Sequence, residues 1–525
     1  MVNSVFNRID YFPRLSGWIF ILCLLIMSFL YDYQEIIKLR PQGLHQWRQC
    51  DCLSLTLNYA KDRYDFLDPQ MHSQEADKGA SGRTIRELPY FYFIIATLWK
   101  IFGVHEWMYR ALVILFVFTG LFFLFKTIED VLKNSFWGIG ISLLLFTSPF
   151  FVYYTNNFID DTPSLALSMV SLFFFWKYYD KRKIKYFLIC LLFCLLAVLT
   201  RVISVLLLLG IITLFAADLL KLLRNKEGAR IFNKPVLSIL LFVSVFLIIF
   251  LWYSFARKFN LIHHSGFFLI GTLPLWQLDW QNVRIIMERV GDFWISQYFA
   301  KSVLILCLIL LLSFLFHIRK IERIWLILTS SVFAGVIAYL VLYFKVLENH
   351  DYHLICLLIL IPLIFITFLD LLQKQYPVLY HSFLLKVAFL ILFISSFFHA
   401  QTNLKQRYSG WMNKTHMAYY KPLETITPYL RSLGIERSDK VLSIPDPSFN
   451  ITLYLMDQKG YTSGGSNTDS FQFFKMFRNG LQYIIINDDR MLEHPAIKGY
   501  LKYPVGIYQS IKIYDVRPYK KMFAP

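Results

Sequence analysis

The sequence predicts an all-α polytopic membrane bundle followed by a small C-terminal α/β domain. Two observations lead to this prediction. Of the 525 residues, 57% are hydrophobic and only 17% are charged, which is more apolar than a soluble domain can bury. Long apolar runs recur along the chain up to about residue 400 and then stop. We therefore expect a membrane domain over residues 1–400 and a second domain over residues 401–525.

The apolar runs indicate about eleven transmembrane helices, because each is roughly 15 to 22 residues long and ~20 residues cross a bilayer as an α-helix. No small-residue cleavage site follows the first run, so we expect it to be retained as a span. The runs begin near Leu15, Trp107, Phe136, Thr162, Tyr186, Val202, Val236, Ser302, Ile324, Leu354 and Phe383.

Basic loops set the expected orientation. The apolar stretch from Pro89 to Gly103 is broken by Lys100, which suits an interfacial or re-entrant helix better than a span. If this stretch does not cross and the N-terminus is cytoplasmic, the basic loops 181–183, 221–234 and 317–320 all lie inside. That arrangement agrees with the positive-inside rule. We therefore expect a multi-pass protein of the plasma or inner membrane.

The same topology places three large segments outside the cytoplasm: the first outer loop at about residues 32–106, the 257–301 loop and the tail. Nearly every polar residue of chemical interest then lies on one side. A single extracytoplasmic active site would produce this distribution, although polar residues also collect at membrane surfaces without a catalytic role.

The tail after residue 400 has the pattern of a water-exposed domain. Residues 440–444 and 482–487 are short apolar runs bounded by polar residues, which favours buried strands. Helical patterns occur at 423–433 and 471–477. We expect a small α/β domain outside the cytoplasm.

Asp51 is the most informative residue of the first outer loop. It opens a stretch with Leu53, Leu57 and Ala60 on one helical face, so we expect it to begin an amphipathic helix that lies along the membrane. A helix N-terminus favours the charged form of a carboxylate, and the charged form can act as a base. Capping of the helix is the structural alternative for the same residue.

At this point the sequence resembles a known family. Asp51 is followed in order by Glu87-Leu88-Pro89-Tyr90, Ile101-Phe102-Gly103 and a turn with Glu and Arg at residues 105–110. This order is similar to that of the GT-C glycosyltransferases, in the branch of protein O-mannosyltransferases and the lipid A aminoarabinose transferase. The likeness in architecture extends over roughly residues 15–371. Where the family has an acidic pair, this chain has the single acid Asp51.

The resemblance implies an enzyme that transfers a sugar from a polyprenyl-phosphate carrier to an extracytoplasmic glycan, lipid or protein acceptor, with inversion. It makes Asp51 the catalytic base and Glu87 a second acidic catalytic residue. Phosphate is a good leaving group, so the general acid of a glycosidase can be omitted. One carboxylate that deprotonates the acceptor and cations that hold the phosphate would suffice.

Arginines are the expected phosphate ligands. Some relatives have Glu-Lys-Pro where this chain has Leu88, so Arg48, Arg86 or Arg83 must supply the charge, and arginine binds phosphate through a bidentate fork. Arg201 ends an apolar run at the outer face and is a further candidate. The alternative for Arg201 is snorkelling to the membrane interface.

Other polar residues at the outer ends of spans are candidates for binding acceptor or sugar. Helix N-capping is the alternative for the acidic pair that precedes Thr162, and ordinary membrane-interface behaviour is the alternative for the aromatic residues beside them. The candidates are His45, Asp160, Asp161, His350, Asp351 and Tyr352.

A divalent metal ion is the one cofactor that we consider. Glu87 with His263 and His264 could form a site of mixed nitrogen and oxygen ligands, although adjacent histidines point in different directions in regular structure. Cys50 and Cys52 flank Asp51, but no second cysteine or histidine pair stands at a suitable spacing, and the seven cysteines are better interpreted as small apolar residues.

The net charge of +18 is spread over loops and membrane flanks, so lipid headgroups explain it better than nucleic acid, which we do not expect as a partner. Three alternatives to the transferase stay open: a transporter or flippase of lipid-linked saccharides, a polysaccharide polymerase or ligase, and an inactive scaffold. A transporter favours ionisable residues at mid-membrane and repeated halves. The predicted spans are nearly free of charge, and we find no repeat.

Overall fold

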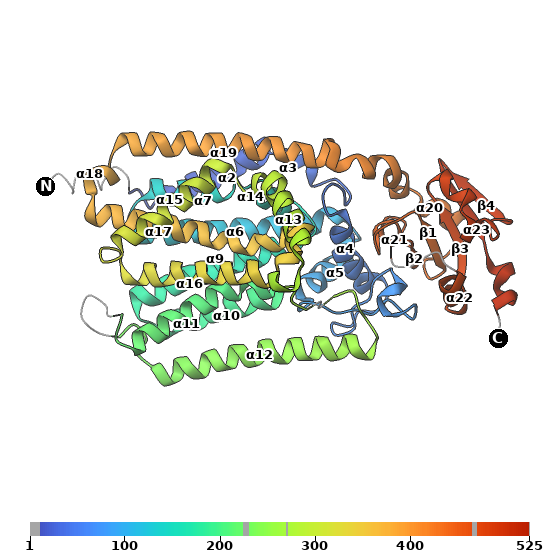
Figure 1. The fold of residues 1–525 in the computed structure, drawn as a ribbon, viewed down its shortest axis with the longest axis horizontal. Helices are drawn as coiled ribbons and strands as arrows, with labels where there is room; N and C mark the ends of the chain where they lie inside the picture. The colour runs from blue at the N-terminus through green and yellow to red at the C-terminus, as the bar shows by residue number, and fades with distance from the viewer. Residues whose placement is uncertain (1–10, 224–229, 269–270, 465–469, 524–525) are drawn as a thin grey trace.

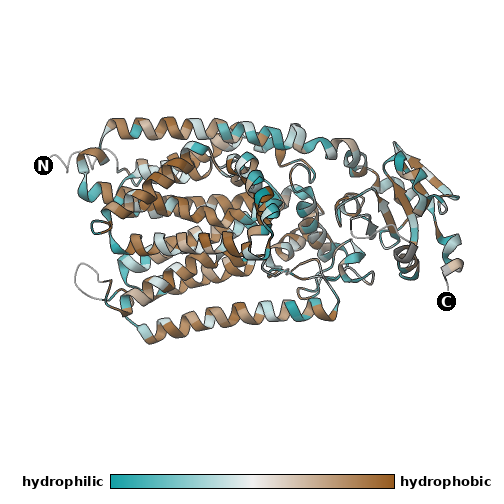
Figure 2. Ribbon diagram, viewed as in Figure 1, coloured by the Kyte–Doolittle hydropathy of each residue, from teal (hydrophilic) through white to brown (hydrophobic). Residues whose placement is uncertain are grey.

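A computed structural model describes residues 11–223, 230–268, 271–464 and 470–523. Part of the basic loop 221–234 lies outside these described residues. The helices of the membrane domain run side by side along the long axis, and the C-terminal domain lies beyond one end of the bundle (Figure 1). Figure 2 shows that hydrophobic residues predominate along the bundle helices. The bundle consists of α2 (Ser16–Leu30), α6 (Glu106–Leu132), α7 (Ser135–Leu145), α8 (Pro149–Thr155), α9 (Asp161–Lys181), α10 (Ile184–Thr200), α11 (Val205–Leu219), α12 (Pro235–Ile262), α15 (Lys301–His317), α16 (Arg323–Leu342), α17 (Leu360–Gln375) and α19 (Phe383–Ser409).

Within the described residues, six helical segments are long and apolar enough to cross a membrane, and the number rises to eight if two bent helix pairs each count as one span. Three further apolar helices are shorter, at 10–17 residues. Lipid-facing surfaces are evident on α12, where Leu240 and Val243 are each 58% exposed. The chain is therefore a multi-pass membrane protein. Each predicted run forms a helix, but the count of about eleven spans is not confirmed.

Several short elements lie in the loops between the bundle helices. They are α3 (Tyr33–Ile36), α4 (Gln46–Lys61), η1 (Gln74–Asp77) and α5 (Tyr90–Phe102) of the first outer loop, and η2 (Val202–Ser204), α13 (Trp280–Arg289), η4 (Val290–Trp294), α14 (Ile295–Tyr298), η5 (Phe344–Glu348), η6 (Asp351–Ile359) and α18 (Pro377–Tyr380). Helix α5 has 13 residues, which at ~1.5 Å per residue do not cross ~30 Å of hydrocarbon.

Two expectations for Asp51 are wrong. Helix α4 begins at Gln46, so Asp51 lies in its second turn rather than at its N-terminus. The helix is also not amphipathic with one exposed face, because side chains on all its faces are buried, Cys50 and Leu53 completely. The C-terminal domain covers α4, and no sequence pattern within α4 indicates that cover.

The C-terminal domain contains a five-stranded mixed sheet in the order β2-β1-β3-β5-β4. β1 (Lys440–Ile444) pairs in parallel with β2 (Gly460–Thr462) and β3 (Leu481–Ile486), whereas β5 (Ile511–Asp515) is antiparallel to β3 and to β4 (Pro504–Tyr508). Both predicted strands are confirmed, the second with a shift of one residue. The domain's helices are α20 (Thr427–Ser432), α21 (Ile451–Leu455), α22 (Ser470–Arg478) and α23 (Pro495–Lys498).

Candidate functional site

A cavity of about 450 Å³ is lined by residues from α4 and from the ends of several bundle helices. Segments far apart in the sequence build its wall: α4, the end of the first outer loop, the turn between α10 and η2, and the start of η6. Charged and aromatic side chains line it together. Among them are Trp47, Arg48, Arg86, Glu87, Arg201, His350, Tyr352 and His353.

Glu87 lies between two guanidinium groups at the cavity wall. Arg86 Nε is 2.5 Å from Glu87 Oε2, and Arg201 Nη1 is 2.5 Å from Glu87 Oε1. The Nε of Arg201 also lies 2.6 Å from Asp161 Oδ1. Burial raises the pKa of the Glu87 carboxyl, and the charge of Arg86 opposes that rise. Arg201 is only 4% exposed, so it is a buried partner of two acids and not a snorkelling residue.

The guanidinium group of Arg48 has buried hydrogen-bond donors without a protein acceptor among the described residues. Its Nη2 lies 3.2 Å from Asp160 Oδ1, and Tyr92 donates to Asp160 Oδ2 at 2.8 Å. Its Nε and Nη1 are buried and have no hydrogen-bond partner among the described residues. Unpaired buried donors are costly, and an anion in the cavity would supply the acceptors that these two nitrogens lack. Asp160 makes no side-chain capping bond to α9, so capping does not explain it.

Asp51 lies one helical turn after Arg48, on the same side of α4. Its side chain is buried, and it forms no ion pair within the described residues. Burial raises the pKa of the Asp51 carboxyl to about 7, against the opposing charges of Arg48 and Arg86. A carboxyl with a pKa near neutrality is well suited to general base catalysis. Asp51 itself does not line the cavity, whereas Trp47 and Arg48 of the same helix do.

His45 and Asp351 form a pair beside the cavity. His45 Nε2 is 3.0 Å from Asp351 Oδ1. Asp351 also accepts a hydrogen bond of 2.6 Å from Tyr154 and lies 3.3 Å from Arg407 Nη2. Asp351 is therefore held by protein groups, and the pair fixes the beginning of α4 against η6 and α19.

Aromatic rings cover the side of the cavity next to this pair. The ring of Trp47 lies 6.1 Å from that of Tyr352 and 5.5 Å from that of His350. Burial lowers the pKa of His350 to about 4, so this imidazole is neutral at pH 7. Neutral rings beside buried arginines form a surface suited to a sugar or to an uncharged lipid segment.

A sequence model of the family described as dolichyl-phosphate-mannose-protein mannosyltransferase matches residues 86–254. ArnT from Cupriavidus metallidurans, solved with undecaprenyl phosphate bound, aligns with a TM-score of 0.56 at 12% identity, over 95% of this chain and 98% of its own. The chain has an ArnT-like fold. No curated protein has significant similarity to it in sequence.

Two structures of an oligosaccharyltransferase from Archaeoglobus fulgidus are also similar in fold to this chain. One, in complex with zinc and sulfate, has a TM-score of 0.54 at 12% identity, covering 89% of this chain and 68% of its own. The other, named AglB, in complex with an inhibitory peptide and a dolichol phosphate, has a TM-score of 0.51 at 11% identity, covering 91% and 70%. These findings confirm the resemblance to the GT-C glycosyltransferases.

The structure does not bring the residues of the expected metal site together. His263 and His264 follow the end of α12 and do not line the cavity that contains Glu87. Both Glu87 oxygens are occupied by arginines. In the described part of the chain, no group of three or more His, Cys, Asp or Glu side chains could hold a metal ion. This donor set does not fit a metal, and we derive no step through one.

The remaining expected residues differ in their distance from the cavity. Arg48, Arg86, Glu87, Arg201, His350 and Tyr352 line it, whereas Asp160 and Asp161 lie behind the arginines. Arg83 pairs with Asp68 in the outer loop instead. Sequence reasoning missed Tyr92 and Arg407, because each occurs in a helix without a motif around it.

Proposed function

We propose that this chain is an integral-membrane glycosyltransferase that takes a sugar from a polyprenyl-phosphate carrier. The acceptor is a glycan, lipid or protein outside the cytoplasm. The observation that carries the proposal is the pair of unpaired guanidinium nitrogens of Arg48, buried at the cavity one turn from the buried Asp51. A phosphate suits the unpaired nitrogens of Arg48, and an acceptor hydroxyl suits the carboxyl of Asp51.

The proposed topology places this site outside the cytoplasm and the N-terminus inside, in the plasma or inner membrane. The basic loops 181–183 and 317–320 support this orientation, because both lie at the bundle end opposite the cavity. The carrier's lipid tail would remain in the membrane beside the bundle. Its phosphate would reach the arginines from the outer leaflet.

The proposed reaction is a single displacement. The acceptor oxygen forms a bond to the anomeric carbon of the sugar while the bond from that carbon to the phosphate oxygen breaks. Asp51 takes the proton of the acceptor hydroxyl, and polyprenyl phosphate leaves with the electron pair. Arg48, Arg86 and Arg201 stabilise the negative charge on the leaving phosphate. Attack from the face opposite the phosphate inverts the anomeric centre.

The exchange Asp51→Asn tests the proposed base. A panel of polyprenyl-phosphate-linked hexoses and pentoses is incubated with membranes that contain the protein, and transfer of label is measured. Loss of a general base lowers the transfer rate by about 10²- to 10⁴-fold. Asp65→Asn is the matched control, since Asp65 is in the same outer loop but is 43% exposed. Full transfer by a folded Asp51→Asn protein contradicts the assignment.

A further inference from the structure

The C-terminal domain is anchored on the helix that carries Asp51. At the end of α4, Lys61 Nζ is 2.6 Å from Asp457 Oδ2, and Arg437 of the same domain pairs with Asp62 and Asp457. His72 of the outer loop contacts Asp457 through Nε2 at 3.2 Å. These groups span the boundary between the two domains.

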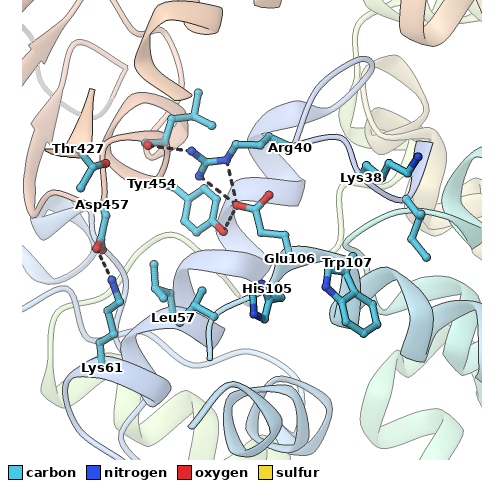
Figure 3. A pocket seen from close by; sticks show the side chains of 13 residues that line it. Lys38, Arg40, Leu57, Lys61, His105, Glu106, Trp107, Thr427, Tyr454 and Asp457 are labelled. Carbon is cyan, nitrogen blue, oxygen red and sulfur yellow. Dashed lines mark hydrogen bonds and ion pairs between the residues drawn. The ribbon is translucent and has the colours of Figure 1, made fainter. Parts of the chain in front are cut away.

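A second set of contacts joins the domains beside this one (Figure 3). Arg40 Nη2 lies 3.0 Å from Glu106 Oε1, and Tyr454 donates to the same oxygen at 2.7 Å. Arg40 also donates to the carbonyl groups of Glu424 and Leu455. Arg40, Glu106 and Tyr454 line a cavity of about 570 Å³ at the domain boundary, together with Lys61 and Asp457. The C-terminal domain is thus held firmly against the first outer loop.

Asn450 of the C-terminal domain contacts α4 next to Asp51. The Asn450 side chain is fully buried. Its Nδ2 donates to the carbonyl of Cys50 at 3.3 Å, and its Oδ1 accepts from the backbone N–H of Ser73 at 3.2 Å. Cys50 is the neighbour of Asp51 in α4, and the Asn450 amide lowers the pKa of the Asp51 carboxyl. The Asn450 amide thus links α4 to the segment around Ser73 in the first outer loop.

The loop that presents Asn450 is internally fixed. Asp446 accepts hydrogen bonds from the backbone N–H groups of Ser448, at 2.9 Å, and Thr452, at 2.8 Å. The hydroxyl of Ser448 in turn accepts from the backbone N–H of Asn450 at 3.2 Å. A side chain on such a loop loses little freedom when it binds its partner, and it can therefore hold a defined geometry.

The same loop also contacts the wall of the 450 Å³ cavity that contains Arg48, Arg86 and Arg201. The rings of Phe449 and Phe267 lie with their centroids 4.1 Å apart, and Phe267 lines that cavity. One loop of the C-terminal domain therefore contacts both α4, which carries Asp51, and the wall of the 450 Å³ cavity. A domain that served only as an appendage would not need either contact.

We infer that Asn450 is a positioning residue that orients the Asp51 carboxyl, so that the C-terminal domain completes the catalytic site. The inference rests on the proposed function and deepens it. Asn450 acts through Asp51 and does not touch the substrate. Groups that face Asp51 from other elements are Arg86 and Asp446, and Arg48 faces it from α4 itself. Removal of the amide leaves those charges in place.

The test compares Asn450→Ala and Asn450→Asp with Asn479→Ala in the full-length protein. Asn479 belongs to the same domain and donates to the carbonyl of Lys78 in the same outer loop, but it has no contact with α4. The readouts are kcat, KM for the polyprenyl-phosphate-linked sugar and the pH dependence of kcat. On the acid side of the pH profile, kcat falls with a midpoint that does not depend on how much protein is folded. This midpoint of the acid limb therefore remains informative if a variant is unstable.

We expect Asn450→Ala to lower kcat by about 10- to 100-fold with KM nearly unchanged. The acid limb of its pH profile moves upward by about one pH unit, because the amide that favours the charged form of the Asp51 carboxyl is lost. Asn450→Asp moves the limb further, since a second carboxylate disfavours ionisation of Asp51. Asn479→Ala leaves kcat and the limb unchanged. Unmoved limbs in both Asn450 variants overturn the inference, whereas full transfer by Asp51→Asn overturns the proposed function instead.

Discussion

The guanidinium of Arg201 lies 2.5 Å from the carboxylate of Glu87, although 114 residues separate them in the sequence. The contact joins the end of the first outer loop to the turn after α10, and the second ion pair of Arg201, with Asp161, adds the start of α9. Three separate segments of the chain therefore meet at one guanidinium. The shape of the cavity wall depends on that side chain.

Arg201→Gln is expected to destabilise the protein and abolish transfer. The exchange leaves two buried carboxylates without their cation, and breaking a buried ion pair costs about 3–5 kcal/mol. Thermal unfolding in detergent measures the loss. Arg284→Gln is the control, because the Arg284–Glu288 pair is exposed on α13 and its removal should change nothing measurable. Equal unfolding temperatures for both variants contradict the prediction.

Arg48→Lys tests whether the unpaired nitrogens bind phosphate. Lysine keeps the positive charge but loses the planar fork, so the charge-assisted hydrogen bonds from Nε and Nη1 disappear. One such bond is worth about 1.5–3 kcal/mol, which corresponds to roughly a 10- to 100-fold weaker affinity. Titration with undecaprenyl phosphate in detergent measures the affinity directly. An unchanged affinity would exclude Arg48 from the phosphate site.

The pH dependence of transfer follows from the pKa of Asp51, which burial raises to about 7. A base must be deprotonated, so kcat falls as the pH drops through about 7 and reaches a plateau above it. An aspartate with the ordinary pKa, ~3.9, would keep full activity down to pH 5. Initial rates from pH 5 to 9 distinguish the two cases. A flat profile over this range shows that Asp51 is ionised throughout or is not the base.

Local sequence patterns predicted the helices and strands of this protein better than the contacts between them. The apolar runs became helices and the run at 440–444 became β1, because both signals lie within a few neighbouring residues. Three arginines expected at the phosphate, Arg48, Arg86 and Arg201, do meet at one cavity. Their meeting agrees with the expected topology, which placed all three on one side of the membrane.

What the sequence did not predict depends on contacts between distant segments. The cover over α4 comes from residues around Asn450, some 400 positions away. Arg407 holds Asp351 and, through it, His45, yet nothing in the composition of α19 distinguishes this arginine from one at a membrane flank. Burial of Asp51 changes its expected pKa for the same reason. The C-terminal domain contributes to that burial, whereas Arg48 of α4 and Arg86 of the outer loop oppose the rise of the pKa.

Docking of the C-terminal domain is expected to weaken in acid because of His72. Burial lowers the pKa of His72 to about 4, below its ordinary value of about 6.5. Between these two values the undocked state binds a proton that the docked state does not, so docking is fully stable above pH 6.5 and loses stability as the pH falls towards 4. The loss amounts to about 3 kcal/mol at pH 4.

Limited proteolysis of the full-length protein between pH 7.5 and 4 measures this loss as faster cleavage between the two domains. A protease that is active over this range, with rates normalised to an unfolded substrate, removes the pH dependence of the enzyme itself. His72→Asn does not titrate, so its cleavage rate should depend much less on pH than that of the parent protein. Because Asn450 reaches α4 only in the docked state, undocking should also slow transfer. Cleavage that accelerates equally in both proteins would assign the acid sensitivity to another group, such as Asp457.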